Sequence, residues 1–299
     1  MRVLFCLIIS FFLTAFGAEA KLKVVTSTAD LRALVHEVTQ EKADVASIAK
    51  GSQDPHFIEA KPSYMVLVRD ADLVVTNGLS LEIGWIPSLL RGARNPKVIS
   101  GAAGNLDLGS LVEPLDRPTG AVSRSQGDVH PEGNPHFTLD PVRNASLATK
   151  IAERLSELDP PNKESYQKNA AAFGERMNAK VADWKRRLAA TKVQKIVTYH
   201  PTLNYFMDRF GLTVPTYLEN KPGIPPTAQH ILSVIETVKR DGIKLILVDN
   251  FFDTKIADRV AKDVPGVRVV SVGVSVDSTP ELKKLDDVTE QLVRVIEGK

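Results

Sequence analysis

The sequence has almost no cysteine, and this absence excludes several kinds of site. Of its 299 residues only Cys6 is a cysteine, and it lies in an apolar N-terminal stretch. From Lys21 onwards no thiolate is therefore available to bind a metal, to attack a substrate or to form a disulfide. Any site in this part of the chain has to use other side chains.

Charge excess and aromatic residues are also scarce. Thirty-eight basic against 36 acidic side chains leave a formal net charge of +2. A nucleic-acid-binding protein needs a clear basic excess, so we expect no nucleic-acid partner. Aromatic residues make up 6% of the chain. This disfavours a receptor for an organic solute, because such pockets usually offer more aromatic and arginine groups.

Residues 1–20, MRVLFCLIISFFLTAFGAEA, are typical of a secretory signal peptide. Arg2 precedes an apolar run, and Ala18 and Ala20 are the small residues expected before a cleavage site. The run is shorter than the ~20 residues that span a bilayer. We therefore predict cleavage near Ala20 and a mature chain that begins about Lys21; a retained amphipathic anchor is the alternative.

Short β-branched segments alternate with amphipathic segments in both halves of the mature chain. This alternation predicts two α/β lobes, each built on a parallel sheet flanked by helices. The strands expected in the first half are 22–28, 43–49, 71–78 and 97–100, and those expected in the second half are 195–200, 213–218, 244–249 and 267–272.

The segment 162–191 connects the two series. It contains no proline and one glycine, and its composition favours a helix of about 45 Å that joins the lobes. Asn162 is the expected N-cap, and a surface helix of the first lobe is the alternative. The predicted division is a first lobe over 21–160, a connecting helix over 161–192 and a second lobe over 193–299.

Three of the six histidines stand where a regular element ends. His56 follows the strand 43–49, His136 precedes the helix start at Asp140-Pro141, and His200 ends the strand 195–200. Ligands of open α/β sheets bind at the carboxyl ends of the strands. Three imidazoles that meet there suit zinc or a similar divalent ion.

The remaining histidines have ordinary interpretations. His36 and His230 lie in amphipathic helical patterns, where a histidine is most often structural or solvent-facing. His130 lies in GDVHPEG, at the end of a polar loop rich in glycine and proline, and we expect it to be an exposed loop residue. The alternative is that His130 is a feeder ligand that passes ions to the site.

Five motifs occur in a specific order: DPHFIEAKPS, ADLVVTNGLSLEIGW, GNPHFTLDP, VTYHPTLNYFMDRFGL and KPGIPPTAQHI. Together they resemble the zinc and manganese receptors of ABC transporters, the periplasmic metal-binding proteins of cluster A-I, over nearly the whole mature chain. The resemblance implies two lobes joined by a rigid helix, with one metal in the cleft and His56, His136 and His200 as ligands. His200 stands where the manganese receptors tend to have a carboxylate, which favours zinc.

The fourth ligand departs from this pattern. Many members of the family supply an aspartate just after the last strand of the second lobe, where this chain has Val272 or Gly273. Asp249, at the end of the strand 244–249, is the predicted replacement. Glu219, Asp277 and a water molecule remain alternatives.

A zinc enzyme is the main competing class, because three histidines with an open fourth position also describe a catalytic site. The sequence has no His-Glu-x-x-His, Gly-x-Ser-x-Gly or Walker motif, so we predict a non-enzyme. The predicted protein is a periplasmic, monomeric receptor that captures Zn²⁺, or alternatively Mn²⁺. It would deliver the ion to an inner-membrane permease driven by a separate ATPase. The sequence does not distinguish such a receptor from a metallochaperone or a metal-dependent adhesin.

Overall fold

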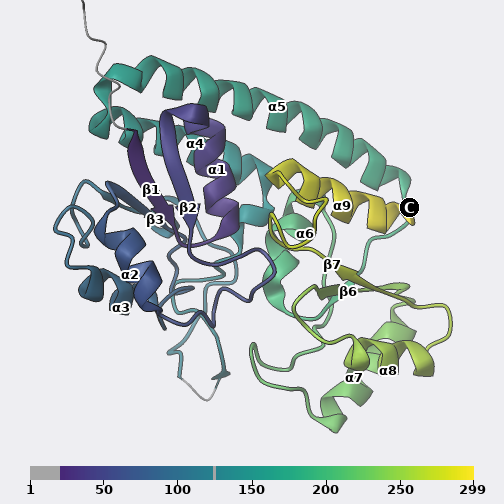
Figure 1. Cartoon of the computed structure of the whole chain (residues 1–299). Helices are drawn as coiled ribbons and strands as arrows, with labels where there is room; N and C mark the ends of the chain where they lie inside the picture. The colour runs from purple at the N-terminus through teal and green to yellow at the C-terminus, as the bar shows by residue number, and fades with distance from the viewer. Residues whose placement is uncertain (1–20, 124–125) are drawn as a thin grey trace, which may run out of the picture.

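The computed structural model describes residues 21–123 and 126–299 (Figure 1). The predicted signal peptide lies outside these residues. Two parallel sheets, each covered by helices, define two lobes, and a long helix connects them. The predicted α/β class is confirmed. Within the described ranges no helix combines the length and the apolar character that crossing a bilayer requires.

The first lobe is built on a four-stranded sheet with the order β2-β1-β3-β4. Val24 and Val25 of β1 point to opposite faces, because side chains alternate along a strand. Val24 packs in the cluster that includes helices α1 and α4, and Val25 packs with α2 and α3. The strands are β1 (Leu22–Thr26), β2 (Ala43–Ser47), β3 (Leu73–Thr76) and β4 (Asn105–Asp107), and the helices are α1 (Ala29–Thr39), α2 (Pro62–Arg69), α3 (Ile86–Ala93) and α4 (Pro141–Leu158).

The second lobe has a three-stranded sheet with the order β5-β6-β7. Ile246 and Val248 of β6 pack against α7 and α8, whereas Leu245 and Leu247 belong to the cluster that includes α9. The strands are β5 (Val197–Thr198), β6 (Leu245–Asp249) and β7 (Arg268–Val272), and the helices are α6 (Asn204–Phe210), α7 (Ala228–Arg240), α8 (Lys255–Asp263) and α9 (Leu285–Glu297). Short 3₁₀ helices include η1 (Gln40–Lys42), η2 (Gly109–Leu111), η4 (Phe137–Leu139), η5 (Pro160–Asn162) and η6 (Pro201–Leu203).

The predicted strand 97–100 is wrong. These residues form a turn, and the strand beside β3 is β4, where Val74 pairs with Asn105. Val98 is buried and packs beneath the sheet, but Ile99 is 53% exposed. The apolar pattern of this segment thus reflects one packed side chain and not a paired strand. The predicted strand 213–218 is reduced to isolated bridges, such as that between Thr198 and Tyr217.

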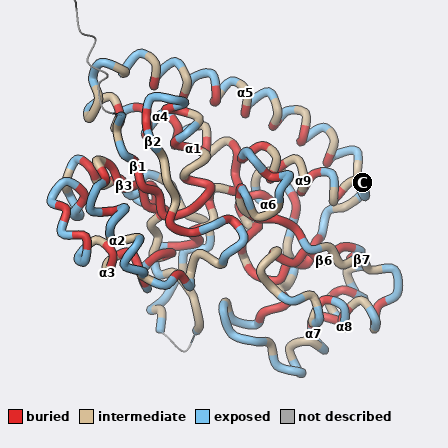
Figure 2. Tube along the Cα trace, in the orientation of Figure 1, coloured by how far each residue is buried: buried red, intermediate tan, exposed pale blue. Residues whose placement is uncertain are grey.

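Helix α5 (Lys163–Ala190) is the predicted connecting helix, and in Figure 1 it runs along one side of both lobes. Asn162 precedes it but makes no side-chain cap; its amide donates to Asp159 instead. One face of α5 is buried against α1, α4 and α9, as the alternating colours in Figure 2 show. The buried residues recur at helical spacing: Tyr166, Ala170, Phe173, Met177, Val181, Trp184 and Leu188.

Ion pairs fasten α5 to both lobes. Arg176 lies 2.7 Å from Glu37 of α1, and Lys180 lies 2.7 Å from Asp286 of α9. Further along the helix, Arg187 makes hydrogen bonds of 2.8–3.0 Å to Glu290 and Glu297 of α9. Because these pairs accompany one shared apolar cluster, α5 forms a continuous support for the two sheets.

The lobes also touch directly beside the N-terminus of α1. The carboxylate of Asp30 accepts a hydrogen bond of 2.7 Å from the backbone N–H of Val276 in the second lobe. A Cβ at Gly51 would lie 1.8 Å from the carbonyl oxygen of Val276, so the two backbones are in close contact. Burial raises the pKa of Asp30 to about 6, although the bond from Val276 opposes this rise.

Asp30 should make the stability of the fold depend on pH. Its pKa is about 6 in the folded protein, against the ordinary value of 3.8 that applies to an unfolded chain, so the folded state binds this proton more tightly. The resulting stabilisation is complete below pH ~4 and is lost as the pH rises through about 6, with a maximum of about 3 kcal/mol. The parent should therefore lose free energy of unfolding between pH ~5 and pH ~8, whereas Asp30→Asn should not lose this contribution. The difference between variant and parent, measured by urea denaturation at each pH, should shift in favour of the variant at pH ~8.

Asp44→Asn is a matched control for this measurement, since Asp44 is exposed on β2. If the free energies of unfolding of Asp30→Asn and the parent differed by the same amount at both pH values, the raised pKa of Asp30 would be contradicted.

Candidate metal centre

His56 lies in the loop that follows β2. Hydrogen bonds with Asp54 and Trp85 fix this loop. The backbone N–H of His56 donates to Asp54 Oδ1 at 3.0 Å, and ring atom Nδ1 lies 2.7 Å from the same oxygen. The indole N–H of Trp85 donates to the carbonyl of Pro55 at 2.9 Å. These bonds fix both the loop and the orientation of the imidazole.

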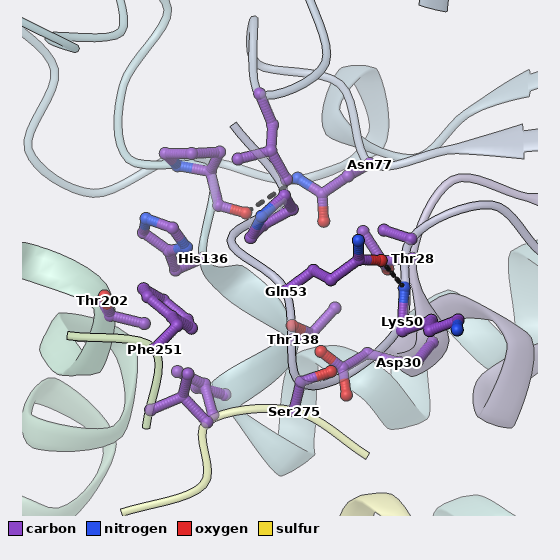
Figure 3. Close-up of a pocket in the computed structure, with 17 residues that line it drawn as sticks. Thr28, Asp30, Lys50, Gln53, Asn77, His136, Thr138, Thr202, Phe251 and Ser275 are labelled. Atoms are coloured by element: carbon purple, nitrogen blue, oxygen red, sulfur yellow. Dashed lines mark hydrogen bonds between the residues drawn. The ribbon is translucent and has the colours of Figure 1, made fainter. Parts of the chain in front are cut away.

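His136 lies at the end of the long connection between β4 and α4. Its backbone N–H donates to Asn134 Oδ1 at 2.9 Å, and Asn77 donates to the carbonyl of Pro135 at 2.8 Å. Figure 3 shows this second bond among the residues that line a pocket beside His136. The cavity there has a volume of about 40 Å³. Helix η4 follows immediately, and Asp140 then caps α4 by accepting from Val142.

His200 follows β5 almost directly, as its position at the end of a parallel strand requires. The hydroxyl of Thr198 donates to the carbonyl of His200 at 3.0 Å, and Pro201 begins η6. Ring atom Nδ1 of His200 lies 2.8 Å from Glu219 Oε2. Both side chains are buried, with 6% and 4% exposure.

The structure brings these three side chains together as the three-histidine group: His56, His136 and His200. One ring nitrogen from each lies within 4.8 Å of the others. The ring centroids are 5.4–5.6 Å apart and the rings meet edge to face. Loops from both lobes thus converge on a single point in the cleft.

Hydrogen bonds determine which nitrogen of each ring is available. A carboxylate only accepts hydrogen bonds, so Asp54 and Glu219 fix hydrogen on the Nδ1 atoms of His56 and His200. This leaves Nε2 of both rings as a lone-pair donor to a metal. Nε2 of His136 is buried without a hydrogen-bond partner among the described residues. Carboxylates that orient the ring and raise its basicity are typical neighbours of metal-binding histidines.

Burial keeps the imidazole of His136 neutral. Burial lowers its pKa well below 6.5, and the neighbouring His56 and His200 add to the effect. Metal binding requires the neutral ring, so His136 presents its lone pair over the physiological pH range.

His130 is placed differently from the expectation. It is half-buried and not exposed, and its Nε2 lies 3.1 Å from Nε2 of His56. Burial, with a contribution from His56 and His200, lowers its pKa to about 3. The only sequence feature that pointed to His130 was its position six residues before His136 on the same connection. That feature does not distinguish a site residue from an ordinary loop residue.

The carboxylates considered as fourth ligands do not join the three-histidine group. Asp249 ends β6 as predicted; its Oδ2 accepts from Thr202 at 2.5 Å, and Oδ1 is buried without a partner in the described chain. Burial raises the pKa of Asp249 to about 6. Glu219 is engaged by His200, and Asp277 pairs with Arg32 and Lys283.

Two cavities flank the group, with volumes of about 290 and 240 Å³. His200 and Asp128 line both. The larger cavity also lies against His130 and His136, and the smaller one against His56 and Glu219. Space for an ion and for side-chain movement therefore adjoins the three ring nitrogens.

Two α/β lobes with three imidazoles converging between them define the class of two-lobed metal-binding proteins. Within this class the chain belongs to the family described as zinc-uptake complex component A, periplasmic (ZnuA), which matches residues 24–297.

Individual relatives agree with this assignment. The zinc-binding lipoprotein AdcA of Streptococcus pneumoniae serotype 4 is 27% identical over 275 residues, which cover 92% of this chain and 52% of AdcA. This chain thus spans about half the length of AdcA. The metal ABC transporter substrate-binding lipoprotein FimA of Streptococcus parasanguinis is 28% identical over 254 residues, which cover 83% and 78% of the two chains. A crystal structure of ZnuA shares the fold, with a TM-score of 0.78 and 22% identity over 93% of this chain and 99% of that one.

The two carboxylate–imidazole bonds should tune metal affinity. Asp54→Asn and Glu219→Gln keep a hydrogen-bond acceptor but remove its charge, so the carboxylate support of the bound cation through each ring should be lost. Zinc affinity should drop about 10- to 100-fold with the stoichiometry unchanged, as measured by competition with a chelating dye. Glu41→Gln is the control, because the Glu41 side chain is 91% exposed. Parent-like affinity in both variants would refute the orienting role.

Proposed function

We propose that this protein is the solute receptor of an ABC importer and that it captures a divalent metal ion between its lobes. The observation that carries the proposal is the three-histidine group, with one ring nitrogen of each residue within 4.8 Å of the others. Membership in a zinc-uptake family supports a receptor over the zinc hydrolase that the same ligands would otherwise allow.

Zinc is the proposed ion, with His56, His136 and His200 as ligands. Imidazole nitrogen suits zinc, whereas manganese prefers carboxylate and other oxygen donors. The sequence predicts Asp249 as the fourth ligand, and its unpartnered Oδ1 is the feature in its favour. Its position outside the three-histidine group argues against it.

Delivery would follow capture. The predicted signal peptide and the family description support a periplasmic location. We propose that the receptor acts there as a monomer. The loaded protein would dock on an inner-membrane permease, and a partner ATPase would drive release. His136, neutral through burial, would need no deprotonation when the ion enters.

Calorimetric titration of metal-free mature protein with zinc tests this proposal. We expect one tight site, and we expect His56→Ala, His136→Ala and His200→Ala each to weaken it by more than about 100-fold, beyond the effect of an orienting neighbour. His36→Ala is the control, because His36 is exposed on α1. Unchanged binding in all three variants would disprove the site.

A further inference from the structure

We propose that His130 is the fourth ligand of the metal site, so that the loaded protein holds its ion with four imidazoles. This inference rests on the proposed function and adds a residue from the loop that precedes His136. It replaces the feeder or exposed role that the sequence suggested for His130 and the ligand role predicted for Asp249.

The first argument is distance. The Nε2 atoms of His130 and His56 are 3.1 Å apart. Two nitrogens bound to one tetrahedral zinc at 2.0–2.1 Å lie about 3.3 Å apart. His130 therefore already stands at the spacing of a second ligand relative to His56.

The second argument is hydrogen placement. Asp54 fixes hydrogen on Nδ1 of His56, so Nε2 of His56 carries a lone pair. Nε2 of His130 faces this lone pair at 3.1 Å. The two rings thus direct their Nε2 atoms at each other, an arrangement that a cation bound by both nitrogens would stabilise.

The third argument is available space. His130 lies outside the group whose nitrogens are all within 4.8 Å, so ligation requires its ring to move towards His136 and His200. The cavity of about 290 Å³ is lined by all three of these residues. The movement is therefore into open volume and not into packed side chains.

The fourth argument is that the segment around His130 is held by both lobes. The backbone N–H of Asp128 donates to the carbonyl of Pro222 in the second lobe at 2.8 Å. Ser80 of the first lobe donates to Glu132 at 2.7 Å. Gly127 has φ +80°, and a Cβ there would lie 2.1 Å from Pro222 O, so a glycine is needed for this contact. Ligation by His130 would thus couple the ion to a contact between the two lobes.

A fourth nitrogen ligand also bears on selectivity. Replacing a carboxylate or water by imidazole weakens manganese binding relative to zinc. His130 should therefore contribute more to zinc affinity than to manganese affinity.

X-ray absorption of the zinc-loaded mature protein tests the inference, because multiple scattering counts imidazole ligands. The parent should show four imidazoles and His130→Ala three. Competition titration should show zinc affinity reduced at least about tenfold in His130→Ala, with a smaller change for manganese. His230→Ala is a matched control, because His230 lies on α7 and its ring contacts the carbonyl of Tyr217.

Three imidazoles and one oxygen in the parent, with parent-like zinc affinity in His130→Ala, would overturn the inference and leave the receptor function intact. If Asp249→Asn alone lost affinity, Asp249 would be the fourth ligand. A parent protein that binds no zinc would overturn the proposed function as well.

Discussion

The site depends on buried imidazole nitrogens that have no hydrogen-bond donor to face. A buried lone pair without a partner is costly, and native structures rarely retain one without a reason. Here Nε2 of His136 has no partner within the described chain, while Asp54 and Glu219 hold hydrogen on the opposite nitrogens of His56 and His200. Each local bond therefore serves to aim a lone pair at one point, and a divalent cation at that point compensates all of them together.

The two lobes maintain this convergence because they share more than a linker. Helix α5 is packed against α1, α4 and α9, and its ion pairs to Glu37 and Asp286 connect both lobes to one support. Asp140, the N-cap of α4, stands four residues after His136 and forms a bidentate ion pair with Arg209 of α6 in the second lobe. The candidate ligand His136 is thus placed next to a contact that joins the two lobes.

Local sequence signals were sufficient where a residue's role follows from its own segment. His56, His136 and His200 stand at the ends of elements, and α5 was recognisable because 28 residues share one composition. Local sequence signals failed where contacts between residues distant in the sequence determine the structure. The apolar pattern of residues 97–100 is typical of a strand, but Val74 of β3 pairs with Asn105 of β4 instead. His130 looked like a loop residue because its contact with His56 spans 74 positions.

The departure from the family pattern has a physical explanation in the second lobe. Val272 is buried at the end of β7, and a Cβ at Gly273 would lie 2.4 Å from both Leu282 Cδ1 and Ser278 Oγ. Those side chains occupy the space that a carboxylate would need after the last strand. Under our proposal the fourth ligand comes instead from the connection that carries His136, because His130 on that connection already contacts His56 at 3.1 Å.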